Sequence, residues 1–250
     1  MSVVWSSGGG TQSAAIAALI VAGRLPKPDF AVIVDTEREK SATWEYHEAV
    51  VVPRLREVKV ELVRVRKSEY SSVGLYDTHG KVLIPAYTTQ SGQISKMRAY
   101  CSNEWKKRVA FRWMRAQGVQ SCDNWLGISV DEAKRMAFSG TGWVVNRYPL
   151  IEREYGLQWR RQDCIAFLEA QGWPTAPRSA CWMCPHMTTR EWNEMRSTHP
   201  KDFEKAQTLE AEIREGDPHV WLQRGFLLGD KQDAQEVLPG MGCEGGICFV

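Results

Sequence analysis

Three consecutive glycines near the start of the chain are the residues best suited to bind an anion. They lie in the segment Ser6-Ser7-Gly8-Gly9-Gly10-Thr11-Gln12-Ser13, between two apolar runs. Glycines leave room for a phosphate and reach backbone angles closed to other residues, so successive N–H groups can converge on it. The serine and threonine hydroxyls add donors. The segment lacks the Gly-Lys-Ser/Thr ending of a Walker loop, and a tight turn without a ligand is the alternative.

Cysteine is the second chemically capable residue type, with seven copies. Cys181 and Cys184 have the spacing at which two thiolates bind one metal ion. Cys243 and Cys248 form a wider pair beside glycines, which permit a tight turn between ligands. Cys101 lies in a basic stretch, whose cations we expect to lower its thiol pKa. Thiols without a metal are the alternative for all five.

Two acidic residues and an arginine form a third candidate group, after a short apolar run at 124–128. Asp131 and Glu132 are suited to hold Mg²⁺ against phosphates. Arg135 is suited to bind a phosphate or carboxylate through two hydrogen bonds. The alternative is a helix start, where acidic residues interact favourably with the helix dipole.

Apolar runs between these residues predict the elements that must position them. Five segments carry the pattern: buried strands at 3–6, 30–34 and 58–65, and helices at 13–22 and 41–56. Pro53 interrupts the second helix. The order predicts an α/β fold with a doubly wound, mostly parallel sheet. Ligands of such sheets bind at the carboxyl ends of the strands, where the glycine segment and Asp35-Thr36-Glu37 would both lie.

The remainder of the chain predicts further elements and two domains. We expect a lid or substrate loop at 68–95, a fourth strand at 124–128, and helices at 96–117, 161–171 and 189–215. Residues 1–175 are assigned to the α/β domain. Residues 176–250 are assigned to a cysteine-containing helical region packed on it.

Composition limits the class of protein. The chain has 250 residues, 43% hydrophobic and 25% charged, with a net charge of +2, which is ordinary for a globular protein. Basic residues gather at 54–67 and 96–108, but so small a charge gives no electrostatic case for nucleic acid. There is no run as long as a membrane helix and no signal-peptide pattern. We therefore expect a cytoplasmic protein with reduced thiols and no membrane partner; a homo-oligomer stays open.

The glycine segment resembles the PP-loop of the adenine nucleotide α-hydrolase superfamily, whose pattern is Ser-Gly-Gly-x-Asp/Ser/Thr-Ser. Residues 7–13 match it with one additional residue before the final serine. Threonine in place of aspartate resembles the phosphoadenylylsulfate (PAPS) reductase branch. The segment at 179–185 is typical of the members of that branch from phages and DNA-modification systems. Four further segments resemble that branch, in order: Val34-Asp35-Thr36-Glu37, Lys96-Met97-Arg98-Ala99-Tyr100-Cys101-Ser102-Asn103-Glu104-Trp105-Lys106, Leu126-Gly127-Ile128-Ser129-Val130-Asp131-Glu132-Ala133-Lys134-Arg135, and Ser179-Ala180-Cys181-Trp182-Met183-Cys184-Pro185.

The resemblance implies an adenine nucleotide, ATP or PAPS, held with Mg²⁺ in a PP-loop domain at 1–175. The segment after the second strand would lie near the adenosine. The residues implied to bind the nucleotide are Ser6, Ser7, Gly8, Gly9, Gly10, Thr11, Gln12, Ser13, Asp35, Thr36, Glu37, Gly127, Asp131 and Glu132. The residues implied to act in catalysis are Cys101, Lys106 and Arg135. The cations, Arg98 included, would neutralise charge that develops during the reaction.

The resemblance also implies an iron–sulfur cluster of the 4Fe-4S type, and a Cys-Pro pair is common at such sites. The candidate ligands are Cys101, Cys181, Cys184, Cys243 and Cys248. Cys181 and Cys184 are the first two ligands of the set, and either Cys101 or the pair Cys243 and Cys248 would complete it. A structural Zn²⁺ site is the alternative.

Three functions agree with these residues. The first is adenylation-linked sulfur transfer to an acceptor that stays open between a nucleic-acid base and a small molecule. The second is PAPS reduction with release of sulfite. Those reductases carry a C-terminal Glu-Cys-Gly-Leu-His segment, whereas this sequence has Cys243-Glu244-Gly245-Gly246-Ile247-Cys248, which disfavours it. The third is a zinc-stabilised nucleotide-binding subunit of a nucleic-acid modification or defence complex.

Overall fold

A five-stranded parallel sheet forms the centre of the chain, whose computed structural model describes residues 1–230. The strand order is β3-β2-β1-β6-β7, and every neighbouring pair is parallel. The strands are β1 (Ser2–Ser7), β2 (Phe30–Asp35), β3 (Leu62–Arg66), β6 (Cys122–Leu126) and β7 (Val144–Arg147). The predicted α/β fold with a parallel sheet is confirmed. β7 was not predicted from the sequence.

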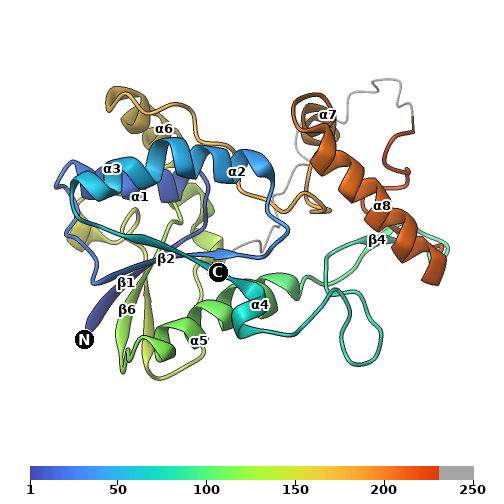
Figure 1. Cartoon of the computed structure of the whole chain (residues 1–250), viewed down its shortest axis with the longest axis horizontal. Helices are drawn as coiled ribbons and strands as arrows, with labels where there is room; N and C mark the ends of the chain where they lie inside the picture. The colour runs from blue at the N-terminus through green and yellow to red at the C-terminus, as the bar shows by residue number, and fades with distance from the viewer. Residues whose placement is uncertain (231–250) are drawn as a thin grey trace.

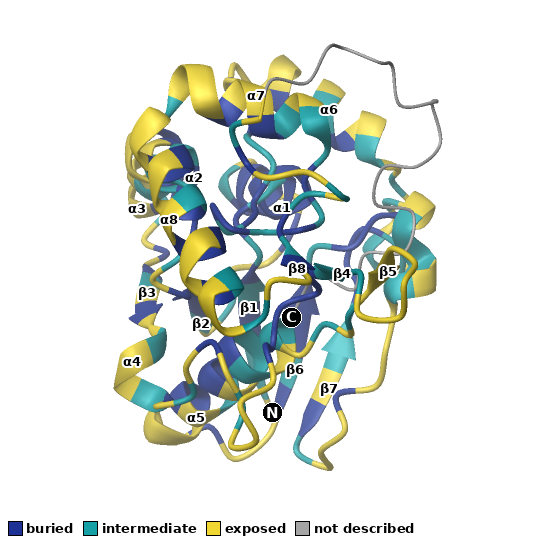
Figure 2. Cartoon of the chain, turned by 90° about the vertical axis from the view of Figure 1, so that its right-hand side faces the viewer, coloured by how far each residue is buried: buried dark blue, intermediate teal, exposed yellow. Residues whose placement is uncertain are grey.

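Helices cover both faces of the sheet (Figure 1). One face carries α1 (Thr11–Val21), α3 (Val52–Glu57) and α6 (Arg161–Ala170), and the other carries α4 (Lys67–Tyr70) and α5 (Arg108–Ala116). Adjacent strand residues point to opposite faces, so Trp5 packs under α1 while Val4 packs under α5, and both are fully buried. Figure 2 shows α1 as a buried helix enclosed by its neighbours. Burial on all sides explains why the sequence of α1 is almost wholly apolar.

The helix expected at 41–56 is continuous through Pro53, where an interruption was predicted. It consists of α2 (Ser41–Tyr46), a π-helical turn (His47–Val51) and α3. The wider turn places the proline in the first turn of α3, where its missing N–H leaves no hydrogen bond unmade. π-helical turns often occur at functional sites.

The segment 68–101 differs from the loop and helix that were predicted for it. It contributes β4 (Tyr87–Thr88) and β5 (Ser95–Lys96) to a second, antiparallel sheet with β8 (Val220–Trp221). Because Lys96 pairs with Tyr87, the helix expected from residue 96 starts later, and the π-helical turn Asn103–Lys107 leads directly into α5.

The C-terminal region contains two helices where a single helical stretch was expected. α7 (Thr189–Thr198) ends before α8 (Pro200–Gly216), which begins at a proline, a residue favoured at the first position of a helix. Residues 75–86 share a second hydrophobic core with residues 182–228, and Trp105 packs in the same core. The domain boundary at residue 175 stays a prediction. Within residues 1–230, none of the helices has the length and apolarity needed to cross a membrane.

Candidate functional site

The glycine segment turns the chain from the carboxyl end of β1 into α1. Gly10 is the N-cap residue of α1, with no side-chain cap and no acidic residue in the first turn, so the first N–H groups of the helix suit an anion. Gly9 has a φ of 77°, in the left-handed region that favours glycine. A Cβ there would lie 3.1 Å from Thr43 Cγ2 and 3.3 Å from Ser179 Oγ. Conformation and packing both require glycine at this position.

The serines of the segment brace the loop from within. The Gly8 N–H donates to Ser13 Oγ (2.8 Å), and the Gly9 N–H donates to Ser7 Oγ (3.3 Å). The Ser6 hydroxyl donates to Asn124 Oδ1 on β6 (2.7 Å), which joins the two central strands. These hydroxyls therefore hold the shape of the loop, whatever else they contact.

The start of α1 is tied to the segment that follows β6. Gln12 Nε2 donates to Glu132 Oε2 (2.7 Å) and to Ser129 Oγ (3.2 Å), and Arg135 Nη1 donates to Glu132 Oε1 (2.6 Å). The residues 130–135 form a 3-10 helix. A Cβ at Gly127 would lie 3.1 Å from both Ser13 N and Ser13 Oγ. The structure thus brings together the predicted residues of the glycine segment and of the segment 127–135.

Asp131 lies on the same 3-10 turn. Burial opposes its ionisation, but hydrogen bonds from Ser129 and from the Arg161 N–H (3.0 Å) prevail and lower the pKa of its carboxyl. Within residues 1–230, no three or more His, Cys, Asp or Glu side chains are arranged to hold a metal ion. Mg²⁺ at Asp131 and Glu132 stays a prediction, since this ion commonly takes only one or two carboxylates together with phosphate oxygens.

The acidic residues after β2 are engaged within the protein. Asp35 Oδ2 accepts two hydrogen bonds from Arg64 (2.7 and 2.9 Å), and its Oδ1 accepts one from the Glu37 N–H (2.7 Å). Glu37 has a φ of 63°, unusual for a residue with a side chain. Its carboxylate accepts from the Ser68 N–H (3.1 Å) and hydroxyl (2.7 Å). These carboxylates fix the loop that presents Thr36.

Glu39, which was not predicted, organises the centre of the site. Its backbone pairs in antiparallel fashion with Cys181, and its Oε1 lies 2.7 Å from Lys106 Nζ. The Thr36 hydroxyl lies 3.5 Å from Cys181 Sγ. The predicted residues Thr36, Lys106 and Cys181 therefore meet at the carboxyl edge of the sheet. Nothing in the local sequence distinguishes Glu39, because its partners Lys106 and Cys181 lie more than sixty residues away.

Three predicted thiols lie close enough to influence one another. Burial raises the pKa of Cys101 to about 11, with Cys184 adding to the increase and Lys106 opposing it. The expected lowering of this pKa by neighbouring cations was wrong, because desolvation outweighs them. Burial, and then Glu39, raise the pKa of Cys181 well above its usual value. Cys243 and Cys248 lie outside the described residues, and Arg98 is exposed.

His47 is a further residue that the sequence did not single out. It is 3% exposed and its Nε2 lies 3.4 Å from the Gly9 carbonyl oxygen. Burial lowers its pKa to about 4, against the opposing effect of this hydrogen bond. The carbonyl can only accept, so the neutral imidazole carries its proton on Nε2. His47 supports the glycine segment from the π-helical turn.

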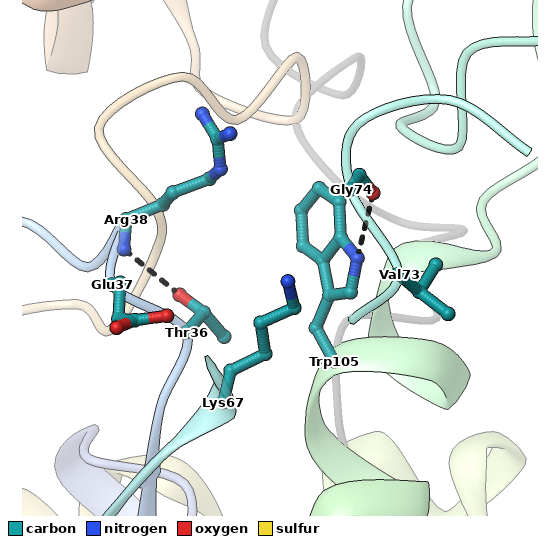
Figure 3. Close-up of a pocket in the computed structure, with 7 residues that line it drawn as sticks. All are labelled: Thr36, Glu37, Arg38, Lys67, Val73, Gly74 and Trp105. Atoms are coloured by element: carbon teal, nitrogen blue, oxygen red, sulfur yellow. Dashed lines mark hydrogen bonds between the residues drawn. The ribbon is translucent and has the colours of Figure 1, made fainter. Parts of the chain in front are cut away.

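A pocket of about 280 Å³ opens beyond the ends of β2 and β3 (Figure 3). Its lining residues come from those two strand ends, from the segment after α4 and from the helix before α5: Thr36, Glu37, Arg38, Lys67, Val73, Gly74 and Trp105. The Trp105 Nε1–H donates to the Gly74 carbonyl (3.1 Å).

Comparisons with known proteins give a distant structural likeness. No protein-family model matches the sequence, and no curated protein matches it. Among solved structures, the chain is similar to "U34-tRNA thiolase NcsA from Methanococcus maripaludis with its 4Fe-4S cluster". The identity is 13% and the TM-score 0.44, over 85% of this chain and 71% of that one. The fold assignment rests on the parallel sheet of this chain itself.

Proposed function

We propose that the chain is an enzyme of the PP-loop type, which binds ATP and uses it to activate an acceptor for sulfur transfer. One observation carries the proposal: a glycine loop and an uncapped helix start lie at the same sheet edge as Cys181 and Lys106. The resemblance to the PP-loop pattern supports the choice of an adenine nucleotide. Thr36 and the neighbouring backbone would then contact the adenosine.

The chain's own residues suit the binding and orientation of such a nucleotide. The N–H groups at the start of α1 would hold the pyrophosphate portion, and Gly127 leaves α1 room against β6. Arg135 and Lys106 each pair with a carboxylate, so they are fixed in place before a substrate binds, which favours electrostatic stabilisation.

The proposed reaction has two balanced steps. An acceptor oxygen attacks the α-phosphorus of ATP, and the bond to pyrophosphate breaks. A sulfide donor then attacks the acceptor carbon, and AMP departs with the former acceptor oxygen. The acceptor is a nucleic-acid base or a small molecule.

An iron–sulfur cluster is part of this proposal, but residues 1–230 do not form a complete site for one. Cys181 and Cys184 are the described residues that would hold it first, and either Cys101 or the pair Cys243 and Cys248 would complete the set. No step is assigned to it. Brown protein with stoichiometric iron and sulfide would support the cluster, whereas colourless protein with one equivalent of zinc would replace it with a zinc site.

The deciding experiment is anaerobic incubation of the purified chain with ATP, a sulfide donor and candidate acceptors. We expect AMP and pyrophosphate in equal amounts, only when an acceptor is present. Sulfite from PAPS would instead establish a reductase. Nucleotide binding without turnover for any acceptor would favour the non-catalytic subunit of a nucleic-acid modification or defence complex.

Gly10→Asp is the sharpest variant for this assay. Gly10 has φ −103° and ψ −170°, which suit an N-cap residue, and a Cβ there meets no atom closer than 3.5 Å. The new carboxylate would cap α1 and repel phosphate. Pyrophosphate release should disappear in a folded protein. Gly10→Asn, which caps without a charge, is the matched control and should retain activity.

A further inference from the structure

The serine at position 179 lies directly against the glycine loop. A Cβ added at Gly9 would lie 3.3 Å from Ser179 Oγ, and one added at Gly10 would lie 3.5 Å from Ser179 N and 3.6 Å from Ser179 Cβ. Because these two glycines lead into α1, both the hydroxyl and the backbone of Ser179 border the start of that helix. A residue from the cysteine-containing region therefore forms one wall of the anion site.

The start of α1 offers donors that the protein itself does not use. The Gly8 and Gly9 N–H groups are occupied by hydroxyl oxygens of the loop. Within residues 1–230, the N–H groups of residues 10–13 donate to no acceptor of the chain. The first N–H groups of a helix have no partner in the helix itself, and together with its dipole they favour an anion.

Ser179 adds a hydroxyl that is also unpaired. The residue is 6% exposed, yet neither its hydroxyl nor its N–H forms a hydrogen bond with another described residue. Thr43 and His47, which also lie beside Gly9, each seal off a polar atom that has no partner in the described structure. The Ser179 hydroxyl, in contrast, retains access to the space around the loop. Burial of an unpaired hydroxyl is costly, so this accessible donor indicates a ligand.

The segment that carries Ser179 is fixed on its other side to the residues that follow β2. Two backbone hydrogen bonds, of 3.1 and 2.9 Å, join residues 180–182 to residues 38–40. The same bridge positions Cys181, two residues beyond Ser179. A ligand bound between α1 and Ser179 would therefore restrain the cysteine segment as well.

We propose that Ser179 binds the pyrophosphate portion of the nucleotide, and that bound nucleotide thereby restrains the segment 179–184. The unused N–H groups of α1 hold the phosphates from one side, and the Ser179 hydroxyl donates to them from the other. This inference rests on the proposed function for the identity of the nucleotide, but not for the position of the phosphates. The coupling is reciprocal, so a fixed cysteine segment also strengthens nucleotide binding.

Calorimetric binding of ATP, pyrophosphate and AMP to the full chain tests the contact. Ser179→Ala should lower the affinity for ATP and for pyrophosphate about tenfold or more, because a hydrogen bond to a charged group is lost. The affinity for AMP should stay unchanged. The melting temperature without nucleotide should stay at the wild-type value or rise, since the hydroxyl has no partner to lose. Ser121→Ala, at an exposed serine before β6, is the control and should change none of these quantities.

Hydrogen exchange tests the restraint separately. At saturating concentration, ATP should slow exchange at the Lys40 and Trp182 amides, whose hydrogen bonds hold the cysteine segment. The wild type and Ser121→Ala should show this protection, and Ser179→Ala should not. A serine that only supports the fold would change the exchange rates without ATP and leave the protection by ATP in place.

An unchanged ATP affinity in Ser179→Ala would overturn this proposal and leave the proposed function standing. A loss of affinity together with a lower melting temperature, or an equal loss for AMP, would also overturn it, because the serine would then support the fold or contact another part of the nucleotide. If the wild type binds pyrophosphate through Ser179 but neither binds nor cleaves ATP, the proposed function fails and the phosphate contact stands. A chain that binds neither ATP nor pyrophosphate would overturn both.

Discussion

His47 shows how one buried side chain can support a binding loop without touching the ligand. Its Nε2–H donates to the carbonyl of Gly9 (3.4 Å), the residue with left-handed backbone. Its Nδ1 is buried without a hydrogen-bond partner in the described structure. Protonation of that nitrogen would bury an uncompensated charge, which explains why burial lowers the pKa to about 4.

This lowered pKa predicts acid sensitivity of the fold. The unfolded histidine takes up a proton near its usual pKa of 6.5, whereas the folded one does so only near 4. The unfolding free energy should therefore be unaffected by His47 above pH 6.5 and fall as the pH drops from 6.5 to 4, by about 3 kcal/mol in all. Urea unfolding at pH 7, 5.5 and 4.5 measures this. In His47→Gln, which retains a donor for Gly9, the decline should be shallower; identical slopes would contradict the assignment.

Gly127 is the second residue whose identity decides the site, for steric reasons. A Cβ would approach Ser13 N and Oγ at 3.1 Å and the Gln12 carbonyl carbon at 3.2 Å. Gly127→Ala should cost about 1–3 kcal/mol of unfolding free energy and weaken ATP binding, because the start of α1 must shift. Gly142→Ala is the control, since a Cβ there meets nothing within 4 Å. Thermal unfolding and ATP titration should distinguish the two variants; equal behaviour would show that the contact is easily relieved.

At the scale of elements, the parts predicted correctly are those with a local signal. β1, α1 and β2 were predicted to within about two residues. Each is an apolar run ended by glycine or by acidic residues, a signal contained within about ten consecutive residues. β4, β5 and β8 have two residues each, too few for a local signal, and β8 becomes a strand only by pairing with β4 across more than a hundred residues. The Glu39–Cys181 pair has the same origin. The predicted site residues were therefore placed by motif, while Glu39 and His47 required the tertiary structure.

A carboxylate in the second half of α8 fixes the segment that follows the helix. The buried Glu210 carboxylate accepts hydrogen bonds from the N–H groups of Leu222 (2.8 Å) and Leu228 (2.7 Å). Glu210→Gln replaces one acceptor oxygen with a donor, so one N–H should lose its partner at a cost of about 1–3 kcal/mol. Hydrogen exchange at these two amides should accelerate. Glu212→Gln, at an exposed position two residues along, should leave it unchanged; protection retained in Glu210→Gln would mean that the amides find other acceptors.

At the scale of the molecule, the candidate site lies where two hydrophobic cores meet. The glycine loop and α1 belong to the sheet and its first core, whereas Cys101, Cys181 and Cys184 pack against the second core. The antiparallel bridge between residues 38–40 and 180–182 links the two. A nucleotide held by the loop would therefore act on residues that a different part of the fold positions.

Ligand-linked stability tests this arrangement in the intact chain. ATP at a hundredfold excess over its dissociation constant should stabilise the native state by about 2.7 kcal/mol, which corresponds to an increase in melting temperature of roughly 5–10 °C for a protein of this size. Gly10→Asp should melt at the wild-type temperature or slightly above it, because aspartate is a better N-cap than glycine, yet show no increase with ATP. Gly10→Asn should respond as the wild type does. An equal ATP response in Gly10→Asp would place the phosphates away from the start of α1, since only there does the added carboxylate meet them.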